Sequence, residues 1–428
     1  MQVLVIGGGG REHTLVWKLA QSPNVEKIYA VPGNPGMKKL AECVQLDVSD
    51  REGLAAWAKK HQIDLTVVGP EAPLVEGLVD VFQQHGLTVF GPTAKAAAIE
   101  GSKIFSKELM QKYGVPTAFF KVCDTLQEAK AFVEEKGAPI VIKADGLAAG
   151  KGVVVAMTKA EAMEALEEMM AGHKFGAAGN KVVIEEFMEG EEASLFAFTD
   201  GKTIVPMLAA QDHKRVYDGD KGPNTGGMGA YCPAPVMTPE LKQKTMDTIL
   251  RPVVDAMAKE GRPYAGCLYA GLMINRDSIK VVEFNARFGD PETQAVLPLL
   301  KSDLATIMVA CAKGTLRPDM VEWETHKAAV CVVMASGGYP ASYPKGLPIT
   351  GLEEAGAMQD VVVFHAGTQE VNGQILTHGG RVLGVTAVAE DIPTAQRKAY
   401  AAVEKIHFEG AHYRKDIAWR ALRRINNK

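Results

Sequence analysis

The chain has 428 residues, enough for about two to four domains, and 47% hydrophobic beside 23% charged residues is ordinary for a soluble globular protein. The formal net charge of −4 argues against nucleic-acid binding, and no apolar run approaches the ~20 residues of a membrane-spanning helix. The six cysteines include no C-x-x-C pair, so the sequence predicts reduced structural thiols and no zinc site. Because the first strand begins without a basic leader segment, we expect a cytoplasmic protein.

The first hundred residues alternate short β-rich runs with helical stretches. Strands are predicted at residues 3–6, 27–31, 65–68 and 88–90, and helices at residues 12–21, 51–61 and 76–85. This rhythm predicts a doubly wound parallel sheet in a domain of residues 1–102, with ligands at the carboxyl ends of the strands.

The pattern changes after residue 102. A small α+β module is predicted at residues 116–189, inside a central domain of residues 103–325. The last residues, 326–428, look like a separate α+β module with strands at 328–335, 361–366 and 381–388 and a helix at 392–406. The whole chain is therefore predicted to be a multidomain protein of α/β and α+β type.

A glycine-rich loop follows the first strand and opens a helix; it contains Gly8, Gly9, Gly10, Arg11 and Glu12. Glycines let the backbone approach an anion, and a helix N-terminus supplies N–H groups, so a monophosphate site is expected. The alternatives are a tight turn without a ligand and the dinucleotide site of a nicotinamide-dependent oxidoreductase. Glu12 stands where that fingerprint needs its last glycine, and the second strand ends without an acid for the ribose.

Two more loops follow strands of the same predicted sheet. The first contains Asn34, Pro35 and Gly36, and the second contains Glu71. Each alone is a plain turn, but the loops should gather at one sheet edge, which favours a phosphosugar pocket. Glu71 is then expected to accept hydrogen bonds from sugar hydroxyls or an amine.

A Gly/Ala-rich loop from Lys143 to Gly152, with Gly150 and Lys151, joins two predicted strands. It is not a Walker A loop, because it lacks GK[ST] and a strand follows it. Such a hairpin can fold over a triphosphate, with Lys143 and the earlier Lys103 as point charges. Solvated lysines are the alternative.

The run Glu185, Glu186, Phe187, Met188 ends a strand and enters a turn. Backbone groups there can hydrogen-bond an adenine that Phe187 and Met188 cover, and Glu192 can take ribose hydroxyls. An acidic solvated turn is the alternative.

Further along, Asp212, His213 and Lys214 precede a loop that contains Gly226, Gly227, Met228 and Gly229. Successive glycines expose N–H groups that can bind a carboxylate or an oxyanion. Alternate strand residues share a face, so Asp212 and Lys214 are better catalytic candidates than His213.

Residues 281–285 read as a strand. Glu283, Asn285 and then Arg287 should point one way, while Val282 and Phe284 point into a core. Carboxylate and amide oxygens suit Mg²⁺, and an arginine can clamp phosphate. A solvated charge cluster is the alternative.

The whole run 281–294 closely resembles the signature of the phosphoribosylamine–glycine ligases (glycinamide ribonucleotide synthetases), an ATP-grasp family. Further matching runs stand in the family's order at residues 8–13, 33–36, 69–74, 143–153, 212–215 and 225–229. The C-terminal module matches only in general character.

The resemblance implies that ATP drives the joining of glycine to 5-phosphoribosylamine through a glycyl phosphate, in de novo purine biosynthesis. Residues 103–325 would be the ATP-grasp domain, with residues 116–189 as a mobile lid that protects the intermediate from water. The chain would act on small molecules alone, as a monomer or weak homodimer. The alternative is another ATP-grasp carboxylate–amine ligase, a carboxylase or a transformylase, but such relatives would lack the continuation at residues 287–292.

The resemblance also assigns roles to residues. Glu283 and Asn285 would hold Mg²⁺ (or Mn²⁺), Lys103 and Lys143 would neutralise the phosphates, and Arg287 would stabilise the transferring phosphoryl group. Asp212, with Lys214 as a second catalytic residue, and the loop 226–229 would hold glycine.

Overall fold

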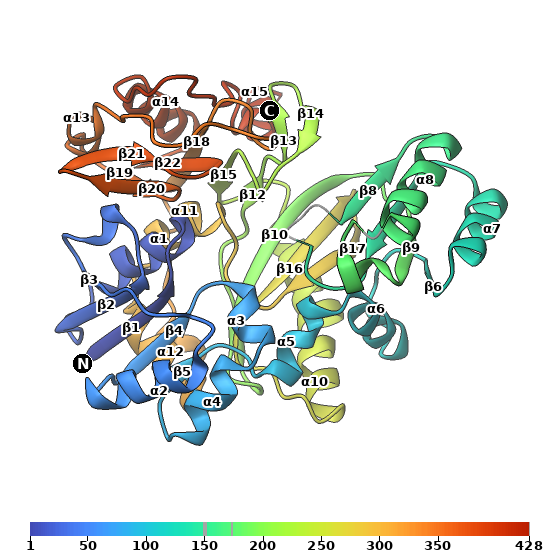
Figure 1. Cartoon of the computed structure of the whole chain (residues 1–428), viewed down its shortest axis with the longest axis horizontal. Helices are drawn as coiled ribbons and strands as arrows, with labels where there is room; N and C mark the ends of the chain where they lie inside the picture. Colours follow the sequence, from blue (N-terminus) through green and yellow to red (C-terminus); the bar gives the residue numbers. More distant parts are fainter. Residues whose placement is uncertain (149–151, 173, 428) are drawn as a thin grey trace.

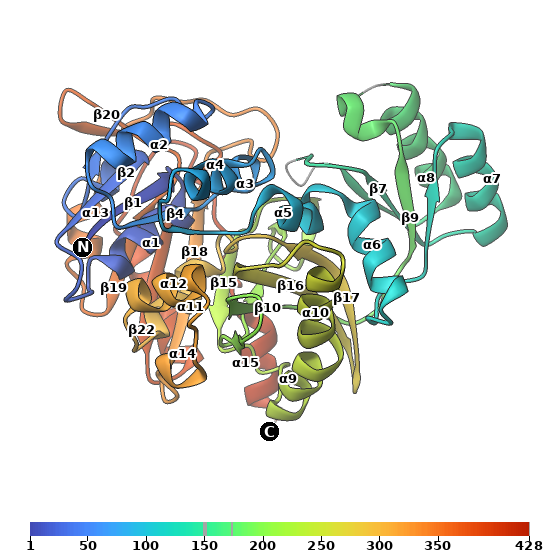
Figure 2. The same cartoon turned by 90° about the horizontal axis from the view of Figure 1, so that it is seen from below.

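The computed structural model describes residues 1–148, 152–172 and 174–427. The N-terminal and C-terminal parts lie together at one end of the molecule, and the module that carries α7 and α8 projects at the other end (Figures 1 and 2). Within these described ranges, no helix is long and apolar enough to cross a membrane.

The N-terminal sheet has the strand order β3-β2-β1-β4-β5, and every neighbouring pair is parallel. Leu4 and Ile6 belong to one hydrophobic core, while Val3 and Val5 belong to another. Both faces of the sheet are therefore covered, as in a doubly wound fold. The bounds are β1 (Gln2–Gly7), α1 (Gly10–Leu19), β2 (Lys27–Pro32), β3 (Glu42–Cys43), α2 (Arg51–Lys60), β4 (Leu65–Val68), α3 (Glu71–Val75), α4 (Leu78–Gln84) and β5 (Val89–Phe90).

The helix predicted at residues 76–85 is wrong at its start. Gly77 adopts a left-handed conformation with φ of +95°, which ends one helix and precedes the next. The result is two short helices, α3 and α4, and Glu71 lies in the first turn of α3 instead of in a loop.

The central sheet is antiparallel in the order β11-β10-β16-β17. Its register shifts where Gly271 pairs with Glu283 and Leu272 pairs with Val281, so Val282 is an extra, bulged residue. Val281 and Phe284 both enter the core although they are three residues apart. The prediction that Val282 points into the core is therefore wrong. The bounds are α5 (Ala94–Gly101), α6 (Lys103–Lys112), β10 (Glu191–Thr199), β11 (Ile204–Pro206), α9 (Pro239–Thr245), α10 (Arg251–Lys259), β16 (Gly266–Asn275), β17 (Ser278–Asn285), α11 (Thr293–Val296) and α12 (Leu304–Lys313).

The segment from residue 116 to 189, called the lid module below after the role predicted for it, contains its own antiparallel sheet in the order β6-β9-β7-β8. Helices α7 and α8 pack on this sheet around a hydrophobic core that is separate from the others. A short parallel bridge between Thr117 and Val281 joins the start of the module to β17. The bounds are β6 (Phe120–Cys123), α7 (Leu126–Lys136), β7 (Ile140–Ala144), β8 (Val153–Ala156), α8 (Lys159–Leu166) and β9 (Val182–Glu186).

The C-terminal sheet has the order β12-β15-β18-β22-β19 and includes strands from the central part of the chain. β15 pairs with β18 from Gly229 to Cys232, and β12 pairs with β15. The five-stranded sheet is therefore shared between the central and C-terminal parts of the chain, while β20 and β21 form a small two-stranded sheet from C-terminal residues alone. The bounds are β12 (Gln211–Asp212), β13 (Arg215–Tyr217), β14 (Lys221–Asn224), β15 (Gly229–Cys232), β18 (Ala328–Ala335), α13 (Leu352–Gly356), β19 (Val361–His365), β20 (Thr368–Val371), β21 (Gln374–Thr377), β22 (Arg381–Ala389), α14 (Ile392–Val403) and α15 (Trp419–Asn426).

Candidate active site

Glu283 lies where β17 meets the lid module. The Lys143 Nζ of β7 donates to the carbonyl oxygen of the bulged Val282 at 3.3 Å, which joins the two sheets beside Glu283. Burial alone would raise the pKa of Glu283, but Lys143, Lys214, Lys103 and Arg287 outweigh it and hold that pKa below its usual value. The carboxylate is therefore ionised, and four cations lie close enough to stabilise its charge.

Glu283 and Asn285 offer one carboxylate and one amide oxygen from the same strand. Among the residues that the structure describes, no group of three or more His, Cys, Asp or Glu side chains could hold a metal by itself. Two hard oxygen donors fit an ion that keeps water and takes phosphate oxygens as further ligands, which is the habit of Mg²⁺. They do not fit a closed zinc-type site.

Arg287 is held by two acids of the N-terminal part of the chain. Its Nη2 lies 3.0 Å from Glu100 Oε1, and its Nε lies 3.3 Å from Glu71 Oε2. Burial opposes the charged form, yet Glu100 and Glu71 keep the pKa of Arg287 above its usual value. Glu100 also accepts the backbone N–H of Ala286 at 2.6 Å. Sequence reasoning missed Glu100, because one acid in an Ala-rich helix carries no signal of a distant arginine.

Of the predicted lysines, Lys143 lies beside Glu185, and a further lysine joins it there. Lys143 Nζ lies 3.0 Å and Lys107 Nζ 3.3 Å from the same Glu185 Oε2, and all three side chains are buried. Burial lowers the pKa of Lys107 to about 8 although Glu185 opposes that shift. Lys103 Nζ donates to the carbonyl of Gly146 at 2.8 Å. Lys107 is one helical turn from Lys103, and this i, i+4 spacing is the signal that could have found it.

The segment predicted to hold adenine borders a cavity of about 800 Å³. Glu186, Phe187 and Met188 line it together with Met273 of β16. Glu185, in contrast, directs its carboxylate to the two lysines. Gly150 and Lys151 lie outside the described residues, and Gly152 comes just before β8.

Asp212 and Lys214 share a charged neighbourhood with Glu192. Lys214 Nζ lies 2.9 Å from Glu192 Oε2. Burial raises the pKa of Asp212 to about 7 although Lys214 opposes the shift, while Glu192 and Asp212 hold the pKa of Lys214 well above its usual value. His213 is buried, and burial lowers its pKa to about 3, so its ring is neutral.

The prediction of free N–H groups along Gly226–Gly229 is wrong for Gly226, Gly227 and Met228, because each of these N–H groups binds another part of the protein. Gly226 N donates to Tyr339 Oη at 3.0 Å, Gly227 N to Thr225 Oγ1 at 3.0 Å, and Met228 N to the His213 carbonyl at 2.7 Å. What the glycines allow is close packing. A Cβ at Gly226 would lie 2.8 Å from the Arg381 guanidinium carbon, and one at Gly227 would lie 2.4 Å from Pro291.

Two backbone donors of the first glycine-rich loop, and the side chain of Arg11, are bound by the protein's own carboxylates. Gly9 N donates to Glu12 Oε2 at 2.9 Å, and Arg11 N donates to Asp290 Oδ2 at 3.1 Å. Arg11 Nη2 lies 2.8 Å from Glu12 Oε1, and Arg11 Nη1 donates to the Phe288 carbonyl at 3.2 Å. The guanidinium is nearly buried, so this geometry does not support the monophosphate contact expected from Arg11.

Asn34 ties the N-terminal loops to the C-terminal sheet. Its Nδ2 donates to the carbonyls of Gly8 and His365 at 2.9 Å each, and its Oδ1 accepts the N–H of Gly36 at 3.0 Å. The Asn34–Gly36 turn, with Pro35 at its centre, is therefore held by protein contacts.

Arg381, at the start of β22, lies between the first glycine-rich loop and the Gly226–Gly227 turn. Its Nη1 donates to the Asp290 carbonyl at 2.9 Å and lies 3.7 Å from Asp290 Oδ1. Its side chain keeps 23% of its surface exposed. Sequence reasoning missed it, since an arginine that opens an apolar strand gives no local sign of a ligand.

A doubly wound N-terminal domain, the module of residues 116–189 and a strand whose Glu283 is surrounded by cations from other segments define an ATP-grasp enzyme. The chain belongs to the phosphoribosylglycinamide synthetase family: the family's N domain matches residues 1–100, its ATP-grasp (A) domain residues 101–293 and its C domain residues 329–420. Such a family uses ATP together with a divalent metal ion.

Two proteins of the same kind are similar over nearly their full length. The phosphoribosylamine–glycine ligase of Halalkalibacterium halodurans is 52% identical over 99% of this chain and 97% of its own. The crystal structure of the Thermotoga maritima phosphoribosylamine–glycine ligase is 34% identical, covers 98% of this chain and 100% of its own, and has a TM-score of 0.85.

The biotin carboxylase domain of Hydrogenobacter thermophilus 2-oxoglutarate carboxylase is 17% identical over 96% of this chain and 91% of its own, with a TM-score of 0.72. This last likeness concerns the fold alone. The family match leaves no basis for a nicotinamide-dependent oxidoreductase.

Proposed function

We infer that this chain is an ATP-dependent ligase that joins glycine to 5-phosphoribosylamine in purine biosynthesis. The observation that carries the inference is the match to all three domains of one family, together with the cations gathered around Glu283. A carboxylate is a poor acyl donor at neutral pH, which is why the reaction needs ATP.

The chemistry proceeds in two displacements. The glycine carboxylate attacks the γ-phosphorus of ATP, so that ADP leaves and a glycyl phosphate forms. The amine of phosphoribosylamine then attacks the carbonyl carbon, inorganic phosphate leaves, and the amine loses a proton as glycinamide ribonucleotide forms. Catalysis in both displacements is mainly positioning and neutralisation of charge.

Lys103, Lys143 and Arg287 are the groups proposed to contact the phosphates. Lys107 supports this role by sharing Glu185 with Lys143, and Glu100 and Glu71 support it by fixing the fork of Arg287. Glu283 and Asn285 would hold Mg²⁺, or Mn²⁺, which when bound neutralises phosphate charge. The adenine would lie in the cavity beside Phe187 and Met188, with Glu192 toward the ribose.

Glycine is proposed to lie beside Asp212 and Lys214, where an acid can take its ammonium group. Phosphoribosylamine is proposed to lie between the N-terminal loops, Glu71 and Arg381. In this assignment the exposed part of the Arg381 guanidinium faces the phosphate, because Arg11 is already paired with Glu12. The Gly226–Gly229 turn then shapes the glycine pocket by allowing Arg381 to approach.

Phosphate release measured with ATP, glycine and phosphoribosylamine, and with each omitted in turn, tests the proposal. We expect turnover only with all three, apart from slow leakage. Comparable turnover with bicarbonate or formate in place of glycine would instead assign the chain to a carboxylase or a transformylase.

A further inference from the structure

The β13–β14 hairpin connects the two segments proposed to form the glycine pocket. Asp212 and Lys214 come just before it, and the turn Thr225–Gly229 comes just after it. Hydrogen bonds close its base: Thr225 N and Oγ1 donate to the Lys214 carbonyl at 2.7 and 2.8 Å. The position of the hairpin therefore fixes how the two segments face each other.

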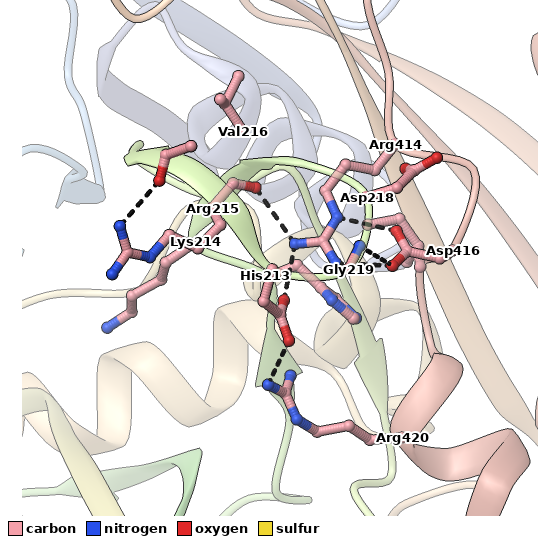
Figure 3. Close-up of polar contacts among 12 residues, drawn as sticks. His213, Lys214, Arg215, Val216, Asp218, Gly219, Arg414, Asp416 and Arg420 are labelled. Atoms are coloured by element: carbon pink, nitrogen blue, oxygen red, sulfur yellow. Dashed lines mark hydrogen bonds and ion pairs between the residues drawn. The ribbon is translucent and has the colours of Figure 1, made fainter.

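Residues 414–420, near the C-terminus, bind the tip of this hairpin through hydrogen bonds and ion pairs. Arg414, whose side chain has no exposed surface, donates from Nη1 to Asp220 Oδ1 at 2.9 Å and to the Arg215 carbonyl at 3.2 Å. Its Nε and Nη2 each bind the carboxylate of Asp416 at 2.9 Å, and Asp416 Oδ2 accepts the N–H of Gly219 at 2.9 Å. Figure 3 shows Arg414 and Asp416 pointing into the loop that carries Gly219.

Residues 415 and 420 make two more contacts with the tip of the hairpin, and residue 418 makes a third contact at its base. Lys415 N donates to Asp218 Oδ1 at 2.8 Å, and Arg420 Nη2 donates to Asp220 Oδ2 at 2.6 Å. At the base, Ala418 N donates to His213 Nε2 at 3.0 Å. His213 stands in the sequence between Asp212 and Lys214, the two residues proposed to act on glycine. The neutral ring of His213 is the form that can accept this hydrogen bond.

This arrangement is more than a surface ion pair. Arg414 makes several charge-assisted hydrogen bonds from a side chain without exposed surface, to two carboxylates that keep 26% and 24% of their own surface exposed. The sheet adds a second link, because β12 and β15 on either side of the hairpin join β18 of the C-terminal sheet.

We propose that Arg414 is a positioning residue for glycine, which fixes the β13–β14 hairpin through Asp220 and Asp416 and so sets the distance between the Asp212–Lys214 segment and the Thr225–Gly229 turn. The inference rests on the glycine site proposed above. Lys103 and Lys143, which are proposed to bind ATP, stand on α6 and β7 and receive no contact from this cluster. Loosening the hairpin should therefore affect glycine more than ATP.

The test compares Michaelis constants in the full-length enzyme. Arg414→Met removes the fork, and we expect the KM for glycine to rise roughly tenfold while that for ATP stays within about twofold. Arg414→Lys keeps the charge but cannot bridge both carboxylates, so it should fall between. Arg397→Met is the matched control, because Arg397 is an exposed arginine of α14 in the same module.

Asp220→Asn keeps the proposal testable if Arg414→Met does not fold. Asn has the shape of Asp and tolerates the left-handed φ of +56° at this position, so folding should survive while two ion pairs weaken. An increase in the glycine KM at an unchanged melting temperature supports the proposal. An unchanged glycine KM in both Arg414→Lys and Asp220→Asn, or an equal rise for all three substrates, overturns it.

Asp212→Asn separates this proposal from the glycine site on which it rests. If it raises the glycine KM while the Arg414 and Asp220 variants do not, the glycine site stands and the positioning role of Arg414 is refuted. If Asp212→Asn also leaves the glycine KM unchanged, the glycine site fails and the positioning role fails with it.

Discussion

The region around Glu283 and the glycine-rich loop at Gly8–Gly10 differ in which charged groups the fold brings together. Around Glu283, the charges of Lys103, Lys143, Lys214 and Arg287 outweigh burial and hold the pKa of Glu283 below its usual value. Three of these cations also pair with further acids, because Lys143 contacts Glu185, Lys214 contacts Glu192, and Arg287 contacts Glu71 and Glu100. At the loop, Glu12 binds Gly9 N and the guanidinium of Arg11, and Asp290 binds Arg11 N.

The difference indicates which feature marks an anion site. A helix N-terminus and a row of glycines offer N–H groups, but these groups bind a ligand only if the protein does not satisfy them itself. Several cations gathered around one buried carboxylate are the stronger sign, because a bound phosphate can share their charge-assisted hydrogen bonds. The same reasoning favours Arg381 over Arg11 as a phosphate contact.

Glu283→Gln should produce the largest effect. Gln has the size of Glu but lacks the charge that faces the four cations, so metal and phosphate would lose their shared anchor. We expect kcat to fall by roughly 10²–10³-fold, the range found when a charge-stabilising group is removed from an active site, and the metal concentration for half-maximal activity to rise. Steady-state kinetics over a metal titration measures both.

The exposed acid Glu135 of α7 supplies the control for that experiment. Glu135→Gln should leave kcat and the metal requirement unchanged. An unaltered metal titration in Glu283→Gln would mean that this face of β17 does not hold the ion.

Arg11→Ala should act on folding. The variant leaves Glu12 buried without its partner, and breaking a buried ion pair in this way costs about 3–5 kcal/mol of unfolding free energy. The melting temperature should fall, and the apparent activity with all three substrates should fall together. Denaturant unfolding beside substrate-resolved kinetics distinguishes this from a phosphate contact, for which only the KM for phosphoribosylamine would rise and stability would hold.

Local signals were sufficient for most elements of the fold. Helix α7 runs from Leu126 to Lys136, and local signals mark both of its ends, because Thr125 caps it and Gly137 ends it. Strand β18 also coincides with its prediction, since an unbroken apolar run of that length is buried on both faces. The bulge at Val282 was not predictable, because it depends on the register against β16.

The residues of the candidate site likewise fall into those that one segment of sequence can predict and those that meet only in the folded chain. Glu283 and Asn285 could be chosen from one strand, because alternation along a strand is a local property. Other contacts join residues that are far apart in sequence: Glu100 with Arg287, Arg381 with Asp290, and Arg414 with Asp220 of the β13–β14 hairpin. No single segment of the sequence indicates such a pairing. The shared sheet of β15 and β18 is a further example, since it appears only once the chain is folded.

The lid module offers a test of whether the Glu283 region changes with its ligand while the N-terminal loop does not. Its separate core allows it to move as a unit, and its cations meet the central sheet at Glu283 and Val282. We expect amides of β7 and β8 to become more protected from hydrogen exchange when ATP and Mg²⁺ are added, while those of β1 and α1 stay unchanged. Equal protection of β7 and β8 with and without ATP would contradict a gating role.

The pH dependence of glycine use should show the smallest effect of the four. Burial raises the pKa of Asp212 to about 7, and Lys214 favours the ionised form that is proposed to bind the ammonium group of glycine. Protonation removes that charge, so kcat/KM for glycine should fall as the pH drops through about 7 and level off above it. The raised pKa also means that the folded protein holds a proton which the unfolded chain has released between pH ~4 and 7, so this group lowers stability as the pH rises through that window. Asp212→Asn should abolish the acidic limb of kcat/KM at lower activity, and a limb that persists in the variant would assign the titration to another group.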